Sequence, residues 1–100
     1  MFLGKPYVPA PILVRLRGLR PEYAKSVHVS IEWLPRGRRD SAYACVSNNM
    51  LLVPWMEGAE RARVTITAGT QTAELEIVSR QNHGEVIDVR MRDHASVNAA

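Results

Sequence analysis

Apolar and polar residues alternate most regularly between Arg61 and Met91. In the first part of this stretch the two sets are Ala62, Val64, Ile66 and Ala68 against Arg61, Arg63, Thr65 and Thr67. After Gly69 they are Ala73, Leu75 and Ile77 against Thr72, Glu74 and Glu76. A period of two is typical of a half-buried strand, so the pattern predicts a β-hairpin.

The turn of this hairpin fixes its expected register. Gly69-Thr70 suits the centre of a type II′ turn, in which the first central residue needs a positive φ. The strands then pair Ala68 with Gln71, Ile66 with Ala73, Val64 with Leu75 and Arg63 with Glu76. Apolar residues meet on one face and opposite charges on the other, and each such cross-strand pair adds roughly 0.2–1 kcal/mol.

Shorter alternating or apolar segments predict the other strands: 12–17 (ending at Gly18), 27–34, 41–46, 50–55 and 86–92. Trp33 is the expected core anchor of segment 27–34. Residues 19–25 form a connection in which Pro21 favours one helical turn. Segment 50–55, MLLVPW, is apolar on both faces and is expected to be covered on both, and Ser47-Asn48-Asn49 before it favours a turn.

This amounts to about seven short strands with turn signals at regular spacing, which is typical of a small β-sandwich. The expected fold is therefore an all-β, antiparallel, immunoglobulin-like sandwich over residues 12–92. Residues 1–11 hold Pro6, Pro9 and Pro11 and are expected to form an extended arm. Residues 93–100 are expected to form a flexible tail.

The arm carries large apolar side chains, which predicts that it covers an edge of its own sheet or reaches another subunit. The residues expected to contact a protein partner are Phe2, Leu3, Tyr7, Val8 and Trp55.

Composition restricts the class of protein. One hundred residues with 46% hydrophobic content fit one small domain, and a single cysteine, Cys45, excludes an intramolecular disulfide. No apolar run has the length of a signal peptide or a membrane helix. These features predict a protein without membrane insertion, cytoplasmic or part of an intracellularly assembled particle.

The net charge of +3 comes with eleven arginines and only two lysines. The one dense basic cluster, Arg36, Arg38 and Arg39, lies in segment 35–40, which is expected to be a loop. Guanidinium groups bind phosphate, so this loop is a candidate nucleic-acid contact. A solvated hairpin tip is the simpler interpretation, because no aromatic residue is interleaved to stack a base.

Candidate chemistry is sparse. His28, His83 and His94 show none of the short spacings of zinc ligands, and Cys45 shares an alternating face with Tyr43, which favours a buried, unreactive thiol. No nucleophile elbow, glycine-rich phosphate loop or Ser-x-x-Lys motif occurs. The sequence therefore predicts a protein that is not an enzyme, with no catalytic residues, metal, cofactor or small-molecule substrate.

Residues 47–91, SNNMLLVPWMEGAERARVTITAGTQTAELEIVSRQNHGEVIDVRM, resemble the carboxypeptidase regulatory-like and transthyretin-like β-sandwich domains. The shared order is an Asn-rich turn, an apolar strand, a proline turn with a glycine, a V-x-V type strand and an alternating last strand. Met50 stands where these domains have glycine after the Asn pair, and Arg61 or Ala62 where they often have tyrosine. The resemblance implies a transthyretin-like sandwich of seven strands that serves as an accessory or adhesion module without an active site.

Two functions follow as expectations. The first is a non-enzymatic structural or interaction module that binds protein partners or assembles into an oligomer or larger particle, since association would help stabilise a small disulfide-free core. The alternative is a nucleic-acid-binding β protein that uses the Arg36–Arg39 loop.

Overall fold

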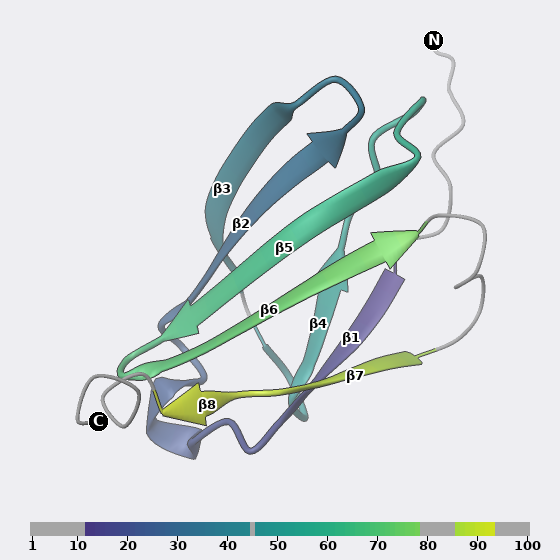
Figure 1. Ribbon diagram of the computed structural model, residues 1–100. Helices are drawn as coiled ribbons and strands as arrows, with labels where there is room; N and C mark the ends of the chain where they lie inside the picture. The colour runs from purple at the N-terminus through teal and green to yellow at the C-terminus, as the bar shows by residue number, and fades with distance from the viewer. Residues whose placement is uncertain (1–11, 45, 79–85, 94–100) are drawn as a thin grey trace, which may run out of the picture.

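The computed structural model describes residues 12–44, 46–78 and 86–93, which form a nearly all-β protein of two sheets (Figure 1). The described part has eight strands and one short 3₁₀ turn. The elements are β1 (Ile12–Arg17), η1 (Pro21–Tyr23), β2 (Val27–Leu34), β3 (Arg38–Ala44), β4 (Met50–Val53), β5 (Arg61–Ala68), β6 (Gln71–Val78), β7 (Val86–Arg90) and β8 (Arg92–Asp93). The predictions for the arm, for Cys45 and for the tail beyond Asp93 lie outside these residues.

The larger sheet has the strand order β3-β2-β5-β6-β8, and the smaller has the order β4-β1-β7. Every pair in the larger sheet is antiparallel, and β1 pairs with β4 in the same way. In contrast, β1 and β7 run parallel, with Leu13 beside Val86 and Arg17 beside Arg90. The prediction of purely antiparallel layers is therefore wrong at this pair, because alternation determines which side chains face the core and not the direction of the neighbouring strand.

The β5–β6 hairpin has the predicted register, from Ala68 beside Gln71 to Arg63 beside Glu76. Gly69 has a φ of +58° and Thr70 is not a positive-φ residue, as a type II′ turn requires. A Cβ at Gly69 would collide with the ring of Tyr23, which packs against the turn. Gly69 is thus needed both for its backbone angle and for the space that it leaves.

One core joins the two sheets. The buried side chains alternate along β1, β2 and β5, as predicted for Ile12–Leu16, Val27–Trp33 and Ala62–Ala68, and both sheets contribute to one continuous cluster. Trp33 is 3% exposed, and its ring packs edge-on against Trp55 with the ring centroids 5.3 Å apart. The indole N–H of Trp33 donates to Asp40 Oδ2 at 3.2 Å, which satisfies its one polar group.

The β2–β3 hairpin differs from its prediction. β3 begins at Arg38, so the tip comprises only 35–37, and Arg38, Arg39 and Asp40 belong to a strand. Gly37, with a φ of +75°, donates its N–H to Trp33 O at 2.7 Å and closes the turn. Arg38, Arg39 and Asp40, which the sequence predicts to lie in a loop, are tolerated in β3. This strand is at the edge of the sheet and its residues are mostly exposed.

Two further segments depart from their predictions. β4 ends at Val53 and is covered on one face only, since Leu52 is 60% exposed. The expected last strand is divided: β7 belongs to the small sheet, and after the buried Met91 the chain enters β8 in the large sheet, which includes Asp93. Met91 donates its N–H to Arg17 O at 2.8 Å at this crossing.

Candidate functional site

The outward face of the small sheet, hereafter the small-sheet outer face, carries a continuous apolar row. Leu13 on β1 is in register with Leu52 on β4 and with Val86 on β7. These three side chains are 36%, 60% and 40% exposed. Among the described residues, only one other large apolar or aromatic side chain, Tyr43, is exposed to a similar degree. Large side chains left in solvent in one row are typical of a contact surface rather than of scattered surface residues.

The next rows of the small-sheet outer face are charged. Arg15 is in register with Asp88, and Arg17 with Arg90. The carboxylate of Asp88 lies between the guanidinium groups of Arg15 and Arg17. Its Oδ1 is 3.6 Å from Nη1 of Arg15, and its Oδ2 is 3.5 Å from Nη1 of Arg17. Arg90 has no ion pair with any residue that the structure describes. Counting the described residues of these rows, three arginines and one aspartate give an excess of two positive charges.

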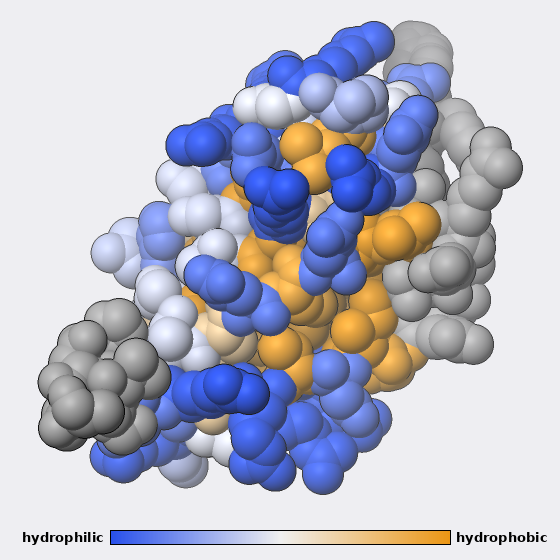
Figure 2. All heavy atoms as spheres, in the orientation of Figure 1, coloured by the Kyte–Doolittle hydropathy of each residue, from blue (hydrophilic) through white to orange (hydrophobic). Residues whose placement is uncertain are grey.

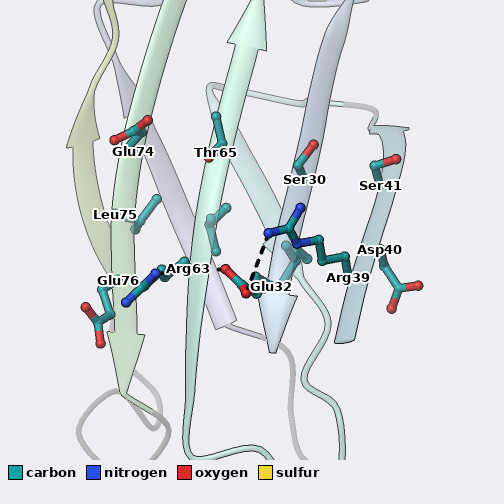
Figure 3. A pocket seen from close by; sticks show the side chains of 12 residues that line it. Ser30, Glu32, Arg39, Asp40, Ser41, Arg63, Thr65, Glu74, Leu75 and Glu76 are labelled. Carbon is teal, nitrogen blue, oxygen red and sulfur yellow. Dashed lines mark ion pairs between the residues drawn. The ribbon is translucent and has the colours of Figure 1, made fainter. Parts of the chain in front are cut away.

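The outward face of the large sheet has a different character (Figure 3). A shallow depression of about 690 Å³ lies over β3, β2, β5 and β6. Its polar side chains form two rows across the strands, one with Arg39, Glu32, Arg63 and Glu76 and one with Ser41, Ser30, Thr65 and Glu74.

The charges of the first row largely satisfy one another. Glu32 forms ion pairs with Arg39 at 3.9 Å and with Arg63 at 4.0 Å, as the dashed lines in Figure 3 mark. Glu76 pairs with Arg61 at 3.1 Å, diagonally across the hairpin, although Arg63 is its partner in register. The expected contact between Arg63 and Glu76 is replaced because Glu32 attracts Arg63 from the other side. This face is therefore a charge-balanced, solvated surface.

The structure separates the three arginines of the predicted basic loop. Arg36 lies in the β2–β3 turn, and Arg38 and Arg39 are in β3. Arg38 lies 3.9 Å from Asp40, and Arg39 is held by Glu32 on the large-sheet face. Two of the three guanidinium groups thus already have a carboxylate partner.

The remaining predicted residues contribute no shared site. His28 packs edge-on against Tyr43, with ring centroids 4.9 Å apart, and Tyr43 is 78% exposed. Tyr43 therefore lies on an outer face, whereas the sequence analysis expected the face that it shares with Cys45 to be buried. Cys45, His83 and His94 themselves lie outside the described residues. Within the described ranges, no group of three His, Cys, Asp or Glu residues is arranged to hold a metal ion.

Of the predicted partner contacts, the structure describes only Trp55. It is 8% exposed and donates its indole N–H to Ala59 O at 3.2 Å, so it stabilises the core beside Trp33. Sequence reasoning missed the row of Leu13, Leu52 and Val86. The signal was present in the outward positions of segments 12–17 and 86–92, but the registers that bring these residues together join strands far apart in the chain.

A further apolar region is visible in Figure 2, between β6 and β7. On these strands the core-facing Leu75, Ile87 and Val89 are only half-buried and pack against the core cluster. At this side of the molecule β6 pairs with the short strand β8, which follows β7 in the chain, and β6 and β7 themselves are not paired. Their core is consequently less covered on this side.

Comparison with protein-family models, with curated proteins and with solved structures found no match. In the part of the chain that the structure describes, no helix has the length and apolar character needed to cross a membrane.

Proposed function

We propose that this protein is a non-enzymatic interaction module, a β-sandwich that binds a protein partner through the small-sheet outer face. The observation that carries this proposal is the exposed row of Leu13, Leu52 and Val86, aligned by two strand pairings. Burying such a row against a partner contributes about 25 cal/mol for each Å² removed from water. The single core that both sheets share supports the sandwich arrangement.

The size of the face indicates the strength of binding. Three strands of about five residues span roughly 14 Å by 17 Å, which is a flat area of roughly 240 Å². Stable complexes bury about 800 Å² on each partner, which is several times more. One copy of this surface therefore gives a transient contact. Repeated copies within a particle would raise the apparent affinity through multivalency.

A site-specific photo-crosslinking experiment tests the proposal. A photoreactive phenylalanine analogue replaces Leu52, and in the matched control it replaces Thr67, which lies on the outward face of the large sheet. In the source cells we expect crosslinked protein species from position 52 that are absent from position 67, and Leu13→Ser in the same chain should remove them. Equal crosslinking at both positions, or none at position 52, contradicts the proposal.

The alternative is nucleic-acid binding through Arg36, Arg38 and Arg39. Its support is the basic turn itself, since Arg36 has no ion pair among the described residues. Titration with a labelled single-stranded oligonucleotide at low salt tests it. Binding that falls steeply with added salt and is lost in the triple alanine variant supports this function, and absence of binding removes it.

A further inference from the structure

The charged part of the small-sheet outer face is unfavourable as it stands. Arg17 and Arg90 lie in register on adjacent strands, and like charges in neighbouring positions repel. Arg90 also extends toward Gly18, since its Nη1 is 3.5 Å from where a Cβ of Gly18 would lie. Asp88 is already shared between Arg15 and Arg17, so it does not neutralise Arg90.

This charge distribution favours one of two candidate occupants of the face, a second copy of the chain or a different protein. A second copy of the chain laid face to face would bring two arginine-rich rows into one interface, each with an excess of positive charge. A protein surface with carboxylates would instead neutralise the excess and bind guanidinium groups in the bidentate geometry that they favour. Charge complementarity therefore favours a different, acidic protein over a second copy.

We propose that the partner of the small-sheet outer face is an acidic protein surface whose carboxylates bind Arg17 and Arg90 while its apolar side chains cover Leu13, Leu52 and Val86. This inference rests on the proposed function and specifies the chemistry of the partner. The apolar row and the Arg17–Arg90 row are four residues apart along β1, which is about 13 Å at 3.3 Å per residue. The partner must present its apolar and acidic groups at that spacing.

The outward face of the large sheet provides the internal comparison. There Glu32 and Glu76 hold three arginines in ion pairs, and none of the four exposed large side chains except Tyr43 lies on it. An acidic, apolar partner would gain little by binding that face. The two faces of one small domain thus differ in both properties that determine the partner.

The experiment titrates the full isotope-labelled chain with a copolymer of glutamate and tyrosine, followed by amide NMR shifts. We expect shifts confined to β1, β4 and β7, and an apparent affinity that falls as salt is added, since exposed charges are screened. Arg90→Glu and the milder Arg90→Gln should weaken binding, the charge reversal by about tenfold or more. Arg36→Glu changes an arginine that likewise has no ion pair among the described residues but lies in the β2–β3 turn, away from β1, β4 and β7, and it should leave this binding unchanged.

The variants distinguish the two proposals. If Leu52→Ser abolishes binding and Arg90→Glu leaves the affinity unchanged, the acidic-partner inference is wrong and the apolar contact surface remains. If neither variant changes the shifts, both fail. Stronger, Arg90-dependent binding to duplex DNA of matched charge would overturn the inference in favour of a nucleic acid, and a sedimenting dimer lost in Leu52→Ser would overturn it in favour of a second copy.

Discussion

Single residues in this protein often serve two purposes, and Trp33 is the clearest case. Its ring fills the core beside Trp55, while its N–H is satisfied by Asp40 on the neighbouring strand. The sequence identified the first role from alternation. The second role could not be predicted, because the sequence pattern places Asp40 in a loop, whereas it lies in β3 beside β2.

The two roles of Trp33 can be separated by mutation. Trp33→Ala removes a nearly fully buried indole and should lower the free energy of unfolding by about 3–5 kcal/mol. Asp40→Ala removes this hydrogen bond together with the exposed ion pair to Arg38, and it should cost about 0.5–1.5 kcal/mol. Urea denaturation measures both values, and equal losses in the two variants would show that packing is not the main contribution of Trp33.

Gly69 and Gly58 form a matched pair for backbone strain. Both have a positive φ, +58° and +87°, so alanine at either position should cost about 1–2 kcal/mol. Only at Gly69 would the added Cβ meet the ring of Tyr23, whereas at Gly58 it meets nothing within 4 Å. We therefore expect Gly69→Ala to lower the melting temperature clearly more than Gly58→Ala, and similar shifts would contradict the packing of Tyr23 on the turn.

At the scale of elements, the register of the β5–β6 hairpin follows from local sequence and the registers between distant strands do not. The turn residues of the β5–β6 hairpin and its alternation determined all of its pairs. No such signal links β1 to β4 or to β7, because these strands are joined by long connections. For that reason the core of the protein could be predicted from the sequence and the candidate contact surface could not.

Strand β4 gives a direct test of which face is buried. Leu51 is 1% exposed and its neighbour Leu52 is 60% exposed. Leu51→Ala should lower the free energy of unfolding by about 2–5 kcal/mol. Leu52→Ala, the same chemical change one residue away, should alter it by less than about 0.5 kcal/mol. Similar destabilisation by both in chemical denaturation would mean that β4 is covered on both faces, as its sequence had indicated.

At the scale of the whole molecule, the two layers have opposite surface properties. The large sheet presents ion pairs and hydroxyl groups, and the small sheet presents an apolar row beside arginines with too few carboxylates. Composition gave the net charge of +3 but not its distribution, which depends on pairing across strands. This difference between the faces connects the fold to the proposed interaction.

The passage of the chain from β7 to β8 has a mechanical consequence. A single residue, Met91, separates a strand of one layer from a strand of the other, and its side chain is buried between them. Sliding the layers past each other would have to stretch this covalent link and break the bond from its N–H to Arg17 O. A partner that pulled on the small sheet would therefore transmit the load to the large one, and the domain should resist shear as one body.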